Sequence, residues 1–220
     1  MTTTARLGRQ IAGASPFVLL DDARVEGATC ARLFRDPIEI LCAREVRDVA
    51  ALLDGLAAAR AGGLHVAGYL AYDGGKALAP ASRHRSALPM DFDAPLGWFG
   101  LFERVERIDA DAVASLLPDP DAAWIGAPQP RVARADYEAA VARVLDYIRA
   151  GDIYQANLTF RADVPFAGDP LAVYARLRQT ARAGYGGFIW TGEQAVASLS
   201  PELFFALRGG AVMARPMKGT

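Results

Sequence analysis

The alternation of apolar and polar positions predicts strands and one helix in the first half of the chain. Strands are expected at 17–20, 28–34, 38–42, 64–72 and 97–102. Apolar residues at three- and four-residue steps predict a helix over 44–60, and Gly62-Gly63 ends it. The polar stretch 76–95 contains prolines and is typical of a loop.

The clearest helical pattern lies after a proline-rich stretch at 118–130, which we interpret as a boundary between regions. It predicts a helix over 136–150, with Asp136 as the N-cap and Gly151 at the position where helices end in a left-handed residue. Its apolar face consists of Tyr137, Val141, Val144 and Ile148.

Residues 153–161 change to a period of two, which predicts a half-buried strand. One face carries Tyr154, Ala156, Leu158 and Phe160. The other face is unusually polar and carries Gln155, Asn157, Thr159 and Arg161. The pattern alone leaves open whether this polar face lines a site or is exposed to solvent.

The pattern in the last part of the chain predicts one helix followed by strands. A helix is expected at 169–182, and strands at 187–190, 194–198 and 203–207. The last strand would form a hairpin with 211–215 across Gly209-Gly210. This order of elements predicts an α+β fold with mostly antiparallel sheets and flanking helices.

Composition narrows the class of protein. The chain has 220 residues, of which 52% are hydrophobic, and its formal net charge is −1. This balance argues against a nucleic-acid partner or an anionic membrane surface. A signal-peptide pattern and an apolar run of ~18 residues are both missing, so we expect a cytoplasmic protein with no membrane partner.

Two residues near the end of the chain could carry chemistry. Lys218 stands between Pro216 and Gly219, and a lysine desolvated at such a strand end is a nucleophile or a base. A uniform count from the Gly209-Gly210 turn places Glu202 opposite Met217, so that Glu202 reaches the same end of the hairpin as a general acid. The alternative for both residues is a solvated surface charge.

Three segments resemble the chorismate-utilising enzymes in order and spacing. Residues 215–220, Arg-Pro-Met-Lys-Gly-Thr, are similar to the R-P-I-K-G-T segment of aminodeoxychorismate synthases. Residues 200–204, Ser-Pro-Glu-Leu-Phe, resemble the S-P-E-x-F segment, and 151–159 resemble G-D-I-x-Q-x-x-L-[ST]. The early run 17–22 looks like the first strand of these enzymes.

The resemblance implies that this chain has a truncated form of the family's fold. It consists of an N-terminal anthranilate synthase component I-like region at 1–117 and the start of the chorismate-binding domain at 131–220.

The resemblance implies roles for single residues. Aminodeoxychorismate synthases carry a lysine where Lys218 stands, whereas anthranilate synthases usually carry alanine. Isochorismate and salicylate synthases place a general-base lysine at the position of Gln155, and glutamine cannot act as a base at neutral pH. Lys218 would then add at C2 of chorismate, Glu202 would protonate the departing C4 hydroxyl, and ammonia would displace the lysine at C4. The substrate-binding residues implied are Gly219, Thr220 and Gln155.

The resemblance also implies ligands and partners. A tryptophan pocket would include Leu20, Asp21 and Tyr185, although both prolines of the family's N-P-x-P-Y segment are missing at 182–186, so tryptophan binding stays open. Mg²⁺ would be held by carboxylates in the C-terminal half of the family, and this chain holds no metal ligand of its own. A glutamine amidotransferase subunit would supply ammonia.

Three functions follow from this comparison. The first is the N-terminal part of an aminodeoxychorismate synthase aminating component, and the second is anthranilate synthase component I. The third is a non-catalytic piece that binds an amino acid or a partner subunit. We expect residues 1–220 alone not to turn over chorismate, because the Mg²⁺ ligands would lie outside them.

Overall fold

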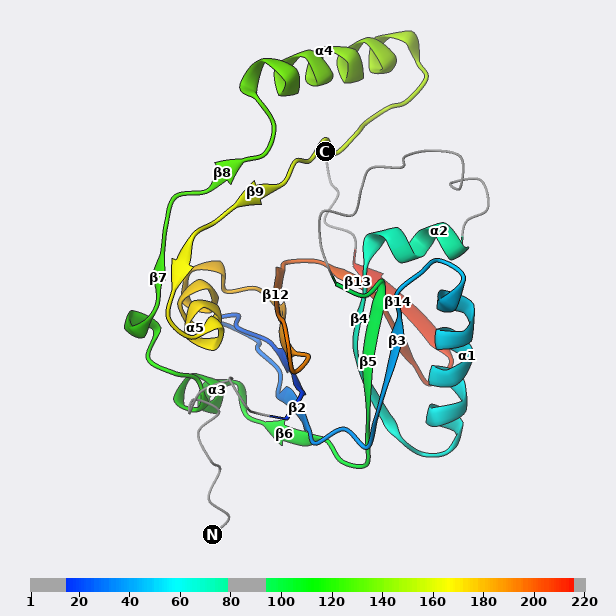
Figure 1. The fold of residues 1–220 in the computed structure, drawn as a ribbon, viewed down its shortest axis with the longest axis vertical. Coiled ribbons are helices and arrows are strands. Elements are labelled where there is room, and N and C mark those ends of the chain that lie inside the picture. The colour runs from blue at the N-terminus through cyan, green and yellow to red at the C-terminus, as the bar shows by residue number, and fades with distance from the viewer. Residues whose placement is uncertain (1–14, 79–93, 216–220) are drawn as a thin grey trace. The chain divides into compact units, whose positions relative to one another are not determined.

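The computed structural model describes residues 15–78 and 94–215. The described residues fall into two compact units, drawn in Figure 1, and each unit is treated by itself. The first unit belongs to Met1–Ala122 and Asp169–Thr220, and the second is Ala123–Gly168. The second unit begins inside the predicted boundary at 118–130. The two units divide the chain differently from the predicted regions 1–117 and 131–220, which stay a prediction.

The first unit is built around a five-stranded antiparallel sheet, here called sheet A. Its strand order is β12-β11-β1-β2-β6. The bounds are Phe17–Asp21 for β1, Ala31–Arg35 for β2, Glu106–Ile108 for β6, Tyr185–Trp190 for β11 and Ala195–Ser200 for β12. Strand β1 lies at the centre of the sheet and pairs with β11 and β2, two segments from opposite ends of the chain.

A second antiparallel sheet, sheet B, contains three strands in the order β3-β5-β4. Their bounds are Glu39–Ala43 for β3, His65–Leu70 for β4 and Gly97–Phe102 for β5. Strands β4 and β5 approach closely at Gly68, where an added Cβ would lie 2.0 Å from the Trp98 carbonyl oxygen. Only glycine can therefore occupy this position of β4 without moving the backbone.

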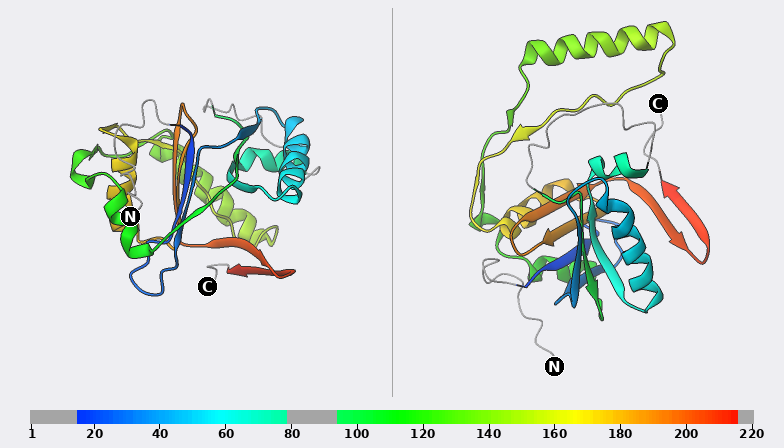
Figure 2. Two further views of the ribbon diagram at one scale, coloured as in Figure 1. Left: turned by 90° about the horizontal axis from the view of Figure 1, so that it is seen from below. Right: turned by 45° about the vertical axis from the view of Figure 1, so that its right-hand side comes forward.

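The two sheets and their helices form layers that can be followed in Figure 2. Helix α1 (Asp48–Ala61) covers the outer face of sheet B. Helices α3 (Ala110–Leu116) and α5 (Pro170–Ala181) cover the outer face of sheet A. The core between the two sheets contains Val18, Phe34, Ala67, Trp98, Phe102 and Ile189. Strand β1 is apolar on both faces because it lies between two cores, which explains its unbroken apolar run.

The C-terminal hairpin confirms the turn predicted from Gly209-Gly210. Strands β13 (Leu203–Arg208) and β14 (Ala211–Arg215) pair across these two glycines, which have φ of +55° and +81°. Arg208 pairs with Ala211 as predicted, but the register shifts by one residue between Leu203 and Ala206. The count from the turn is therefore not uniform as far as Leu203, and Met217, which it placed opposite Glu202, lies outside the described residues.

The second unit consists of short strands and one long helix, α4 (Arg134–Ala150). Its strands are β7 (Trp124–Ile125), β8 (Gln129–Pro130), β9 (Ala162–Asp163) and β10 (Phe166–Ala167), which pair as β10-β7 and β8-β9. In the described part of the chain no residue of α4 is buried. Helix α4 is held to the returning chain by the rings of Tyr137 and Phe160, whose centroids lie 5.2 Å apart.

The strand predicted at 153–161 is wrong. These residues have no strand partner in the described structure, and Tyr154 and Phe160 are 86% and 50% exposed. An alternating pattern forms a strand only when a neighbouring strand accepts its backbone hydrogen bonds. The segment is instead joined to α4 by the Tyr137 hydroxyl, which donates to the Leu158 carbonyl at 3.4 Å.

Several helix boundaries also differ from the prediction. Helix α1 begins at Asp48 rather than at residue 44, because the Asp48 carboxylate accepts the backbone N–H groups of Arg44 and Glu45 and holds them in a separate turn. Helix α4 begins two residues before Asp136, which lies in its first turn and is not the N-cap. Gly151 has the predicted left-handed conformation, with φ of +80°.

Several short elements of the described residues were not predicted. They are helix α3, the two 3₁₀ turns η1 (Tyr72–Gly74) and η3 (Pro120–Ala122), and the strands β6, β7, β8, β9 and β10. A short helix, α2 (Gly75–Leu78), also occupies the start of the predicted loop at 76–95, and residues 79–93 lie outside the described residues. Elements of this length carry too few periodic positions to be recognised from the sequence.

Candidate functional site

Of the two residues predicted to carry catalysis, the structure describes Glu202. Lys218, together with Gly219 and Thr220, lies outside the described residues. Glu202 is exposed in the turn between β12 and β13. Its backbone N–H donates to the Ser200 hydroxyl at 3.2 Å, and that hydroxyl donates to the Glu202 carbonyl at 3.1 Å. The turn therefore fixes the backbone of Glu202 at the start of the hairpin that leads to Lys218.

Gln155 lies in the second unit, in the segment that follows α4. The side chain is exposed, and the segment is not a strand. The structure thus describes Gln155 and Glu202 in separate units and gives no geometry that joins them. Substrate binding by Gln155 stays a prediction.

The most developed polar cluster of the described structure lies at the end of β1. The Asp21 side chain is 0% exposed. Its carboxylate accepts a hydrogen bond from the Tyr174 hydroxyl at 3.0 Å and two from the Arg178 guanidinium, at 2.5 Å from Nε and 3.2 Å from Nη2. Burial, together with the charge and hydrogen bond of Asp21, raises the pKa of Tyr174 well above its usual value. Tyr174 thus remains a neutral hydrogen-bond donor.

Asp22, the next residue, fixes the loop between β1 and β2. Its carboxylate accepts Arg24 Nε at 2.8 Å and Arg24 Nη2 at 2.6 Å, and also the backbone N–H and hydroxyl of Thr29 at 2.9 and 3.1 Å. These interactions, led by the hydrogen bond from Arg24, lower the pKa of Asp22 well below its usual value, although burial opposes them. Two adjacent carboxylates therefore anchor two different parts of the first unit, α5 and the loop.

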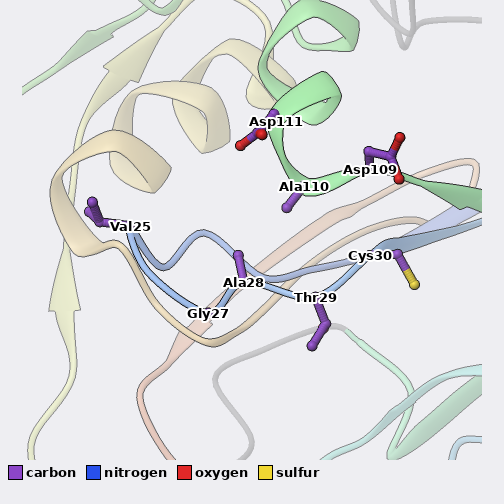
Figure 3. A pocket seen from close by; sticks show the side chains of 8 residues that line it. All are labelled: Val25, Gly27, Ala28, Thr29, Cys30, Asp109, Ala110 and Asp111. Carbon is purple, nitrogen blue, oxygen red and sulfur yellow. The ribbon is translucent and has the colours of Figure 1, made fainter.

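The loop borders a hollow of about 410 Å³, shown in Figure 3. Residues between Val25 and Cys30 form one side, and Asp109, Ala110 and Asp111 at the start of α3 form the other. Among the described residues that line it, the charged side chains are the two aspartates. A dicarboxylate or another anionic ligand would be repelled by these two aspartates.

The three residues of the predicted tryptophan pocket are neighbours in sheet A but do not share one face. Leu20 pairs with Gly187 and belongs to the core between the two sheets, whereas Asp21 pairs with Gly186 and points to α5. Tyr185 precedes this pair on β11. The Asp21 carboxylate is occupied by Arg178 and Tyr174. Tryptophan binding stays a prediction.

Asp22 should make stability depend on pH in the acid range. A carboxylate whose pKa is depressed by folding stabilises the native state above its unfolded pKa, and this contribution is lost as pH falls through the folded pKa. The ordinary pKa of Asp22 is 3.8. We therefore expect Asp22→Asn to lower the melting temperature at pH 7, and the difference from wild type to shrink as pH falls below about 4.

Thermal melts between pH 2 and pH 7 would measure this difference. Asp163→Asn is the matched control, because Asp163 also binds an arginine, Arg131, at 2.6 Å, but in a solvent-exposed pair. Exposed pairs contribute little, so its effect should be small at every pH. A difference for Asp22→Asn that is constant with pH would contradict the assigned role.

Sequence reasoning missed the partners of Asp21. Tyr174 and Arg178 lie one helical turn apart on α5, and both reach the same carboxylate more than 150 residues earlier. Their four-residue spacing places them on one face of a helix, which was the only signal available. The close approach of Gly186, where an added Cβ would lie 2.9 Å from the Tyr174 hydroxyl, required the structure.

A comparison with protein families matches residues 16–220 to the chorismate binding enzymes. The chain belongs to this family. Among the curated relatives that it matches, anthranilate synthase component 1 of Thermus thermophilus is 42% identical over 87 residues, which cover 40% of this chain and 19% of that protein. The predicted family and α+β fold are thus confirmed.

Curated relatives with a second activity match this chain at a similar sequence identity. Aminodeoxychorismate synthase component 1 of Klebsiella aerogenes is 38% identical over 89 residues, which cover 40% of this chain and 20% of that protein. The corresponding protein of Escherichia coli is 34% identical over 92 residues, which cover 42% and 20%. The matched segment thus spans about a fifth of the length of these relatives.

The described residues also bear on metal binding and on membrane insertion. No group of three or more His, Cys, Asp or Glu residues in the described parts of the chain is arranged to hold a metal ion. Residues 15–78 and 94–215 therefore supply no such group for Mg²⁺. No helix between residues 15–78 or 94–215 has the length and apolar character to cross a membrane.

Proposed function

We propose that this chain is the N-terminal part of the aminating component of an aminodeoxychorismate synthase. This enzyme converts chorismate and ammonia to 4-amino-4-deoxychorismate, on the route to p-aminobenzoate and folate. The observation that carries the proposal is Lys218 in the segment Arg215-Pro-Met-Lys-Gly-Thr220, at a position where anthranilate-forming relatives usually carry alanine. Membership in the chorismate binding enzymes supports chorismate as the substrate.

The proposed reaction divides amination into two displacements. The Lys218 amine forms a bond to C2 of chorismate while the C4 hydroxyl leaves, and Glu202 donates the proton that converts this hydroxyl to water. Ammonia then forms a bond to C4 and expels the lysine amine from C2. The exposed position of Glu202 at the start of β13 is compatible with proton transfer to a bound substrate. Gln155, Gly219 and Thr220 would contact the substrate.

Ammonia for the second displacement would come from a glutamine amidotransferase subunit, because free ammonia is scarce at neutral pH. We place the complex in the cytoplasm and assign its Mg²⁺ ligands to parts of the protein other than residues 15–78 and 94–215. When bound, Mg²⁺ would neutralise the carboxylates of the substrate.

Anthranilate synthase component I is the second candidate. One observation favours it, namely that the Thermus thermophilus anthranilate synthase relative is 42% identical to this chain, whereas the Klebsiella aerogenes aminodeoxychorismate synthase relative is 38% identical. Lys218 argues against it, because a lysine that occupies C2 excludes ammonia from the position aminated in anthranilate formation.

The product distinguishes the two candidates. We expect the complete gene product, given chorismate, Mg²⁺ and an ammonium salt, to form 4-amino-4-deoxychorismate, which a lyase converts to p-aminobenzoate for detection by chromatography. Addition of the cognate amidotransferase should allow glutamine to replace the ammonium salt. Anthranilate as the main product would establish the second candidate, and the absence of both products would overturn both proposals.

A further inference from the structure

The Tyr69 hydroxyl is buried and has no hydrogen-bond partner. Among the side chains that the structure describes, it is the one buried polar atom left in this state. Tyr69 lies on β4 and packs against the core between the two sheets. A buried hydroxyl without a partner destabilises the folded protein, because it has lost its hydrogen bond to water and gained none in return. The hydroxyl therefore offers an unused donor to a ligand.

Strand pairing places a thiol on the same face of sheet B as this hydroxyl. Tyr69 and Cys42 both pair with Trp98 of the central strand β5, from opposite sides. Directly paired residues of an antiparallel sheet point to the same face. Trp98 is buried in the core between the sheets, whereas Cys42, on the outer strand β3, is exposed. The face that these three residues share therefore reaches solvent at β3, the edge of sheet B.

Arg44 brings a positive charge to the same place. It lies two residues after Cys42 and is exposed. Burial raises the pKa of the Cys42 thiol and of the Tyr69 hydroxyl, and the Arg44 charge opposes this rise in both groups. The nearby Cys42 adds to the rise of the Tyr69 pKa. The guanidinium, the thiol and the hydroxyl are therefore close enough to act on one ligand.

The two carboxylates that follow Arg44 are engaged with other groups. Glu45 binds the Arg47 guanidinium at 2.9 Å. Asp48 accepts the backbone N–H groups of Arg44 and Glu45, and its carboxylate lies 4.0 Å from Arg47. Within the described residues, neither carboxylate forms an ion pair with the Arg44 guanidinium. An available guanidinium beside an unused hydroxyl is a combination that binds oxyanions.

We propose that Tyr69, Cys42 and Arg44 form a binding site for a small oxyanion at this end of sheet B. The Tyr69 hydroxyl donates one hydrogen bond to the anion, and the Arg44 guanidinium donates a second and neutralises its charge. A carboxylate and an inorganic phosphate share this chemistry, because both present oxygen acceptors with a negative charge. The site contains none of the residues proposed to act on chorismate, so it does not rest on the proposed function.

Thermal unfolding of the 220-residue chain in sodium formate or sodium phosphate tests the site, with sodium chloride keeping the ionic strength constant. We expect the wild-type melting temperature to rise in a saturable manner, by roughly 3–6 °C at ten times the fitted Kd. Tyr69→Phe removes only the hydroxyl oxygen, and Arg44→Gln removes the charge, so each should lose most of this rise. Arg60→Gln, at an exposed arginine in the last turn of α1, is the matched control and should keep it. The anion that acts at the lower concentration identifies the source as a carboxylate or a phosphate.

Melting in chloride alone provides the second measurement. Tyr69→Phe should then unfold at the wild-type temperature or above it, because the substitution removes a donor that has no partner. If wild type is more stable than Tyr69→Phe by the same amount in every salt, the hydroxyl is bonded within the protein or to water, and the proposal is wrong. Equal rises in wild type and all three variants would reveal an unspecific salt effect and would also overturn it, as would no rise in wild type. None of these outcomes alters the product assay that tests the proposed function.

Discussion

Replacement of Lys218 by alanine in the complete enzyme is expected to lower kcat by roughly 10²–10⁴-fold, with a much smaller change in KM. A nucleophile acts in the transition state, so its loss slows the chemical step more than it weakens substrate binding. Ammonia could then enter at C2, and part of the product should shift toward the C2-aminated compound or anthranilate. Steady-state kinetics with ammonium salts and chromatographic analysis of products would measure both effects.

The substitution Lys218→Arg distinguishes a nucleophilic role of Lys218 from a role in which the lysine only supplies a positive charge. An arginine keeps the positive charge that could neutralise a substrate carboxylate, but its guanidinium is a poor nucleophile because it stays protonated. We expect Lys218→Arg to be nearly as slow as Lys218→Ala. If the arginine variant keeps most of the rate, and mass spectrometry of wild-type enzyme trapped with chorismate finds no adduct on Lys218, the nucleophile role is wrong.

The substitution Gly68→Ala is expected to disrupt sheet B. The added methyl group would lie 2.0 Å from the Trp98 carbonyl oxygen and 2.6 Å from the Phe99 Cα, both backbone atoms of β5. Backbone in the middle of a paired strand cannot move aside as a side chain can, so we expect a loss of about 3 kcal/mol or more in the free energy of unfolding. Thermal or denaturant unfolding followed by circular dichroism would measure it.

Gly75→Ala is the matched control for this substitution. Gly75 has helical dihedral angles, with φ of −58°, and no atom lies within 4 Å of an added Cβ. Alanine should be neutral there or should stabilise the protein by about 0.4–1 kcal/mol, because it reduces the freedom of the unfolded chain. If Gly68→Ala unfolds at the same denaturant concentration as Gly75→Ala, the close approach of β4 and β5 is incorrect.

The apolar face of α4 shows what a helical pattern leaves undetermined. The face of α4 was predicted from Tyr137, Val141, Val144 and Ile148, and the helix is present. These residues are partly buried in the described structure, where Tyr137 packs against Phe160 with ring centroids 5.2 Å apart. Periodicity predicts that a helix has an apolar face but does not identify what covers it.

The sequence by itself determined the elements whose signals are local. The turn at Gly209-Gly210, the left-handed Gly151 and the limits of α5, where Asp169 accepts the Leu171 N–H at 2.8 Å, all depend on residues within a few positions of each other. The short segments that resemble the chorismate binding enzymes were likewise recognisable from the sequence alone. The match to the family model confirms that the chain belongs to this family.

The tertiary structure alone decided which distant segments meet. It placed β11 beside β1, brought Tyr174 and Arg178 of α5 to the Asp21 carboxylate, and required glycine at Gly68 and Gly186. It also left 153–161 without a strand partner, although the alternation there is regular. The physical reason is the same in each case. Strand pairing, burial and ion pairing are set by contacts between residues far apart in the chain, and a local pattern carries no information about which partner is present.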